Sequence, residues 1–150
     1  MNTREVTEDG FEVNFATNSL GTYILTTELI PTLRHHANNT DDATNGATDG
    51  TSQATLPRVI TVSSGGMLTQ KLDISDLMSE KMTPFDGTKV YAQQKRQQIV
   101  MTETWAKEHP DIHFSVMHPG WADTPAVRLA INLCSGVSLL WLHKTGAANI

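Results

Sequence analysis

Tyr91 and Lys95 stand four residues apart in a stretch with a helical pattern. Residues at this spacing project from one face of a helix, so we expect the Lys95 ammonium close to the Tyr91 phenol. A free phenol has a pKa of about 10 and is a poor acid or base at neutral pH. A neighbouring cation favours the phenolate and so lowers that pKa. The pair is therefore suited to moving a proton to or from an oxygen atom.

Two polar segments flank this pair along the chain. Ser63 and Ser64 end a run of β-branched residues, and His118-Pro119-Gly120 ends a second such run. A serine hydroxyl near the tyrosine would hold a substrate oxygen while the tyrosine moves the proton. The three segments together indicate carbonyl–alcohol chemistry.

The elements that position these groups follow from the hydrophobic pattern. Residues 58–63 and 112–117 predict two strands, the first of them buried, and residues 88–108 predict the helix between them. Strand, helix and strand make one parallel crossover unit, so Ser64 and Pro119-Gly120 should share one edge of the sheet. That edge is where open parallel sheets bind ligands. Residues 65–87 should form a surface loop with one helical turn around 74–77.

An earlier helix is expected over residues 7–33. Thr7 or Asp9 is a suitable cap for its start, and Pro31 marks its last turn. Asn18 lies inside this helix, and on spacing alone it is a solvated surface residue. Residues 37–54 contain no large apolar side chain, so residues 37–56 are expected to be a disordered, low-complexity insert.

Composition excludes several classes of function. The chain has 150 residues, a formal net charge of −5 and no basic cluster, which argues against nucleic acid as a partner. The apolar stretch at 129–142 is too short to cross a bilayer, so no transmembrane segment is expected. The single cysteine, Cys134, and a polar start indicate an intracellular, cytoplasmic protein. His109 and His113 are four apart, but Pro110 breaks the helix that a metal pair would need, so no metal is expected.

Five segments, in this order along the chain, resemble the short-chain dehydrogenase/reductase family, and within it the group related to the retinol dehydrogenases. They are residues 8–12, 18–23, 58–66, 91–95 and 118–124. A Tyr–Lys pair alone is a weak signal, whereas the ordered set is specific. The resemblance covers residues 2–128 apart from the insert, and it does not extend into the divergent tail at 129–150.

The resemblance implies a role for each matching residue. Tyr91 would be the catalytic acid/base, Lys95 would bind the nicotinamide ribose and lower the tyrosine pKa, and Ser64, rather than Ser63, would orient the substrate. The remaining implied residues are Asn18, whose backbone would hold a water in a proton relay, and Pro119, Gly120 and Thr124, which would lie against the nicotinamide. The implied cofactor is NAD or NADP and the implied substrate is a small carbonyl or alcohol, with hydride transfer as the reaction.

The same resemblance implies a doubly wound, Rossmann-like α/β fold, of which this chain would be a partial version. The family's glycine-rich turn, which binds the pyrophosphate, has no counterpart in the sequence, and neither have the strands that accompany it. We therefore expect residues 1–128 to be the central, catalytic part of such a domain, with impaired cofactor binding. The alternative is a catalytically inactive fragment that acts as an interaction module. In this family the helices that carry Asn18 and Tyr91 commonly form a homo-oligomer interface.

Overall fold

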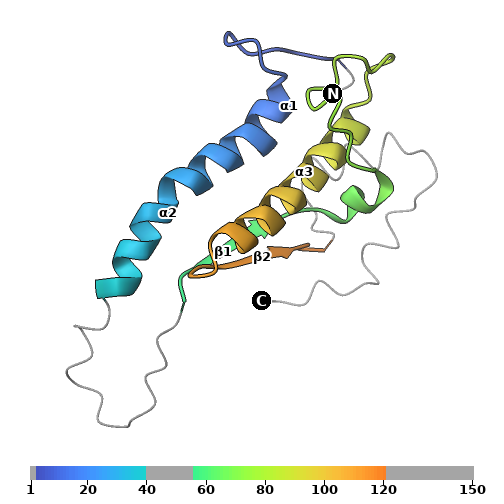
Figure 1. The fold of residues 1–150 in the computed structure, drawn as a ribbon. Coiled ribbons are helices and arrows are strands. Elements are labelled where there is room, and N and C mark those ends of the chain that lie inside the picture. The colour runs from blue at the N-terminus through green and yellow to red at the C-terminus, as the bar shows by residue number, and fades with distance from the viewer. Residues whose placement is uncertain (1–2, 40–55, 121–150) are drawn as a thin grey trace.

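The fold is built on one parallel crossover unit, seen in a computed structural model that describes residues 3–39 and 56–120 (Figure 1). Strand β1 (Arg58–Val62) pairs in parallel with β2 (His113–Met117), and helix α3 (Gly87–Glu108) connects them. The register pairs Val62 with Met117, so the carboxyl ends of both strands lie at the same edge. The expected α/β class and the strand–helix–strand unit are confirmed.

A long N-terminal helical segment lies beside α3 (Figure 1). It consists of α1 (Val13–Phe15), a π-helical turn η1 (Ala16–Leu20) and α2 (Gly21–Asn39). The expected cap at Thr7 or Asp9 is wrong. Glu12 caps this segment instead, because its carboxylate accepts hydrogen bonds from the backbone amides of Asn14 and Phe15, at 3.1 and 2.7 Å.

The expected end at residue 33, in a last turn marked by Pro31, is also wrong, since α2 continues through Pro31 to Asn39. Proline cannot donate the hydrogen bond that the Thr27 carbonyl would accept, and Glu28, Leu29 and Pro31 beside it are exposed, so water can reach this turn. The first three residues of the expected insert therefore belong to α2. Residues 40–55 and 121–150, which include Thr124 and the divergent tail, lie outside the described residues.

Between β1 and α3 the helical turn lies earlier than expected. Residues Gly65–Thr69 form a 3-10 turn, η3, which Ser64 caps by accepting from the Gly66 amide at 3.3 Å. The region around 74–77 contains only turns, because the carboxylates of Asp73 and Asp76 accept the backbone amides that a helix would use. Asp86 caps α3.

The core lies where α2, α3 and β2 meet. Ile30, Trp105, Ile112 and Phe114 are buried together, with the Trp105 and Phe114 rings 6.1 Å apart. Against expectation, β1 is not buried on both faces: the outward side chain of Ile60 remains 57% exposed. The reason is that, among the described elements, helices cover only one face of the sheet. None of the helices in the described ranges is both long and apolar enough to cross a membrane.

Candidate active site

Lys95 lies at the carboxyl end of β1, and Tyr91 lies beside it. The Lys95 Nζ donates to the Val62 carbonyl at 3.0 Å and to the Gln98 Oε1 at 3.1 Å, and it lies 5.5 Å from the centroid of the Tyr91 ring. Burial of the ammonium lowers the pKa of Lys95. The Tyr91 side chain is 40% exposed, so a substrate could reach it. Helical spacing thus brings the two residues together.

The two serines after β1 have different surroundings. Ser63 is buried, and its hydroxyl donates to the Lys95 carbonyl at 2.9 Å, which ties the strand end to α3. Ser64 is half-buried, and its Oγ accepts the Gly66 amide. Within the described residues the Ser64 hydroxyl donates to no partner.

The loop that follows Ser64 runs against the turn of α3 that carries Tyr91. A β-carbon on Gly66 would lie 3.6 Å from the Ser64 Oγ and 4.0 Å from the Ala92 Cβ. These are ordinary contact distances, so the serine hydroxyl and the Tyr91 turn are neighbours across this glycine.

The loop after β2 joins the same edge through His118. The Gly65 amide donates to the His118 Nδ1 at 3.0 Å, and a β-carbon on Gly65 would lie only 3.1 Å from the Nε2 of that ring. His118 was not among the expected site residues, although the sequence places it beside Pro119. Pro119 and Gly120 follow it, both exposed, and Gly120 has a φ of +79°, a conformation that favours glycine.

Asn18 lies in the π-turn and is not the solvated residue that spacing alone suggests. It is half-buried, and its Nδ2 donates to the Gln94 Oε1 at 3.1 Å. Its backbone carbonyl accepts from the Thr22 hydroxyl and from the Gln98 Nε2, both at 2.7 Å. Single π-turns inside α-helices are often found at functional sites.

Three buried glutamines of α3 bind this turn, and sequence reasoning missed all of them. Gln94 donates to the fully buried Glu12 carboxylate at 3.1 Å, and Gln97 binds the Ser19 hydroxyl and the Leu77 carbonyl. Gln98 contacts the Asn18 carbonyl and Lys95. Their spacing of three and four residues was the available signal, because it puts three amides on one face of the helix.

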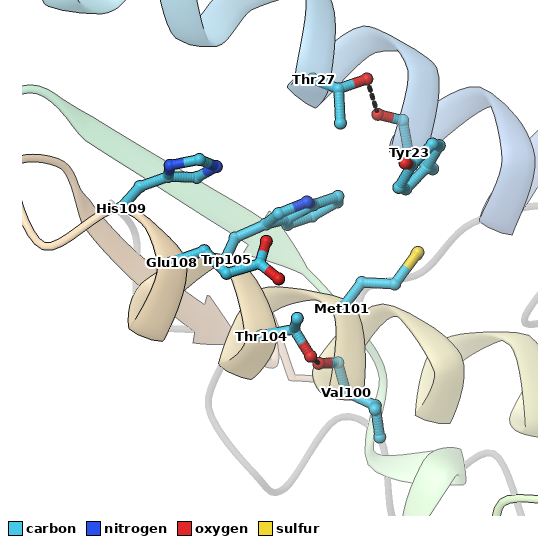
Figure 2. A pocket seen from close by; sticks show the side chains of 8 residues that line it. All are labelled: Tyr23, Thr27, Val100, Met101, Thr104, Trp105, Glu108 and His109. Atoms are coloured by element: carbon cyan, nitrogen blue, oxygen red, sulfur yellow. Dashed lines mark hydrogen bonds between the residues drawn. The ribbon is translucent and has the colours of Figure 1, made fainter.

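A cavity of about 350 Å³ opens elsewhere, between α2 and the second half of α3 (Figure 2). Tyr23 from α2 stacks on Trp105 from α3 with ring centroids 6.1 Å apart, and Glu108 and His109 lie at one end. The remaining lining residues are Thr27, Val100, Met101 and Thr104. None of the expected site residues lines this cavity, so it is separate from the Tyr91–Lys95 edge.

The α/β crossover with a Tyr–Lys pair at the carboxyl end of its strands is the arrangement that the short-chain dehydrogenase/reductase resemblance implied. That resemblance is confirmed by two relatives named dehydrogenase/reductase SDR family member 12. The human protein is 60% identical over 131 residues, and the bovine protein is 58% identical over the same length. The match covers 87% of this chain and 35% of each relative, so the chain spans about a third of their length. No family model matches the chain, and no solved structure does.

Proposed function

We propose that this chain carries the acid/base centre of an NAD(P)-dependent oxidoreductase of the short-chain dehydrogenase/reductase type, acting on a carbonyl or alcohol. The observation that supports the proposal best is the convergence of Ser64, Tyr91 and Lys95 on the carboxyl end of β1. The printed name of the two relatives, dehydrogenase/reductase, supports the same reaction class.

Each residue has a distinct role in the proposed reaction. The Tyr91 hydroxyl gives a proton to the substrate oxygen in reduction and takes it in oxidation. The Ser64 hydroxyl donates to the same oxygen and so orients the substrate. Lys95 holds its positive charge over the Tyr91 ring, 5.5 Å from the ring centroid. Asn18 contributes through the π-turn that binds α3.

The proposed cofactor is NAD or NADP, which when bound supplies or accepts the hydride. Lys95 would hold the ribose, while Pro119, Gly120 and Thr124 would lie against the nicotinamide. Among the described residues, a β-carbon on Gly120 would have no atom within 4 Å, which supports the approach of a flat ring to this position. For the pyrophosphate the sequence has no Gly-x-x-x-Gly-x-Gly turn, so we propose that this chain binds the cofactor weakly. The crossover unit would be one part of a Rossmann-like, doubly wound sheet.

A comparison of the chain with its Tyr91→Phe variant tests the proposal. Calorimetric titration with each nicotinamide cofactor should give an affinity well weaker than micromolar. Turnover of a panel of alcohols and aldehydes, followed by nicotinamide absorbance, should be slow, and Tyr91→Phe should reduce it by about 100-fold or more. Micromolar affinity would contradict the proposed weak binding, and turnover that survives Tyr91→Phe would contradict the acid/base role.

A second candidate function, supported by a different observation, is an interaction module that associates through α2 and α3. The α2 side chains of Ile24, Leu25 and Leu29 are 50%, 63% and 45% exposed, and the cavity of Figure 2 opens between the same two helices. Light scattering should show a homo-oligomer that Leu25→Glu dissociates. Ile74→Glu, in the loop before α3, is the matched control. A monomeric wild-type chain would contradict this candidate.

A further inference from the structure

The side-chain amide of Gln98 has an orientation that its partners determine. Gln98 is 4% exposed; its Oε1 accepts from the Lys95 Nζ at 3.1 Å, and its Nε2 donates to the Asn18 carbonyl at 2.7 Å and to the Thr22 Oγ1 at 3.2 Å. An ammonium can only donate and a backbone carbonyl can only accept, so the reversed amide would lose both bonds.

Two side chains donate to the Asn18 carbonyl in this arrangement. The Thr22 hydroxyl and the Gln98 amide both lie 2.7 Å from it. The direct link from this carbonyl toward Lys95 runs through the amide of Gln98.

We propose that Gln98 is a positioning residue, which holds the Lys95 ammonium over Tyr91 by linking it to the Asn18 carbonyl of the π-turn. The importance of this link for catalysis rests on the proposed function. The link itself rests only on the hydrogen bonds of Gln98. A carboxamide accepts at one end and donates at the other without passing a proton between them. The link therefore places Lys95 and keeps it charged, and does not conduct protons away from it.

Two roles for Gln98 predict different results when it is replaced by leucine. If Gln98 only fills space, leucine fills the same space, and the Lys95 midpoint stays that of wild type. If Gln98 supplies an acceptor to the charged form, its loss leaves the half-buried ammonium with one acceptor fewer. The neutral amine is then favoured, and the pKa of Lys95 falls further below its ordinary value.

The experiment is amine labelling of the whole 150-residue chain across a pH series, with the modified lysines quantified by peptide mass spectrometry. Lys89, exposed on the same helix, is the internal reference. Only the neutral amine reacts, so the midpoint of each pH profile reports protonation, while accessibility changes the plateau alone. In Gln98→Leu the Lys95 midpoint should fall, with a labelling rate below the midpoint about 3- to 10-fold higher than in wild type. In Gln98→Glu it should rise.

The matched control is Gln97→Leu, which removes a buried glutamine of the same helix with two hydrogen bonds of its own but no contact with Lys95. Its Lys95 midpoint should equal that of wild type. A Gln98→Leu midpoint that rises or stays constant would overturn the proposal. If circular dichroism shows that Gln98→Leu does not fold, an unchanged midpoint in Gln98→Glu overturns it equally. The labelling needs neither cofactor nor turnover, so failure of the enzymatic proposal and failure of this one give separate results.

Discussion

At the scale of single residues, the site depends on how closely backbone segments approach one another. Gly65 and Gly66 are adjacent and both have ordinary backbone angles, yet their surroundings differ. A β-carbon on Gly65 would meet the His118 ring at 3.1 Å, whereas one on Gly66 would meet its nearest neighbour at 3.6 Å. The first distance is too short for an unperturbed contact, and the second is ordinary. At Gly65, therefore, the loop that follows Ser64 and the loop after β2 lie so close together that a side chain would disturb the contact.

Gly65→Ala should destabilise the chain by about 1 kcal/mol more than Gly66→Ala. The added methyl group displaces the His118 ring and weakens its hydrogen bond with the Gly65 amide. Urea unfolding of both variants measures the difference. Equal unfolding midpoints would show that the two loops are not joined through His118.

Local periodicity explains which residue contacts could be predicted from the sequence. Tyr91 and Lys95 lie on one helix, so their proximity follows from spacing alone. Asn18 is different, because its partner Gln94 is 76 residues away, and only the packing of η1 on α3 brings them together. The roles of the buried glutamines could not be predicted for the same reason, since a glutamine on a helix is ordinarily a surface residue.

At the scale of elements, the N-terminal helix begins where a buried carboxylate can cap it. Glu12 is fully buried and accepts from the Asn14 backbone and side chain, from the Phe15 amide and from Gln94. All of these partners are donors, so the position needs acceptors at both side-chain oxygens. The start of the helix could not be predicted because one of the groups that bury and bind Glu12 lies 82 residues further along the chain.

Glu12→Gln should lower the free energy of unfolding by about 1–3 kcal/mol, although it barely changes the side-chain volume. The glutamine amide carries an NH2 group, which is a donor. In either orientation of the amide this group faces the donors that bind the Glu12 carboxylate. Urea unfolding measures the loss. Glu8→Gln, an exposed position in the preceding turn, controls for the removed charge and should change stability by less than about 0.5 kcal/mol. Equal effects of the two substitutions would contradict the capping role.

An ion pair joins α2 to the connection between α3 and β2. The guanidinium of Arg34 binds both oxygens of Asp111, with the Nη2–Oδ1 distance at 3.0 Å. This hydrogen bonding from Arg34 lowers the pKa of Asp111 from 3.8 to about 2. Because the folded-state pKa is depressed, the stabilisation is present above 3.8 and is lost as the pH falls toward 2.

Asp111→Asn should therefore destabilise the chain near neutral pH. The difference in stability between the variant and wild type should close as the pH falls from 3.8 to about 2. Urea unfolding midpoints at several pH values measure the gap, which high salt should also reduce because the pair is exposed. Glu103→Gln, on the exposed side of α3, is the control for the change in net charge. A difference in stability that is independent of pH would contradict the lowered pKa of Asp111.

At the scale of the whole molecule, the sheet has two faces with different neighbours. Thr61 and Phe114 face α3, where Thr61 binds the Thr102 hydroxyl and Phe114 packs on Trp105. On the opposite face Ile60, Val62 and Met117 are 57%, 49% and 43% exposed. Alternation along β1 was predictable from a β-branched run, but its exposed face was not, because such a run is equally typical of a strand buried on both sides.

Replacing Ile60 and Val62 together by threonine should reduce the binding of a hydrophobic dye without unfolding the chain. Threonine keeps the β-branch that suits a strand, and both side chains are about half exposed, so each change should cost less than about 0.5 kcal/mol. Dye fluorescence and urea unfolding are the two measurements. Val59→Thr, toward the core, should be clearly more destabilising. Unchanged dye binding would contradict the exposure of this face.

The described part of the sheet consists of β1 and β2 only, so it has no central strand. Among the described residues, each strand hydrogen-bonds to its partner along one side, and along the other side its backbone amides and carbonyls have no strand against them. Edges of this kind are templates for aggregation, because a newly arrived strand gains a full ladder of hydrogen bonds at once. The soluble yield of this chain should then depend on how dilute it is kept, and on whether a complementary strand is supplied while it folds.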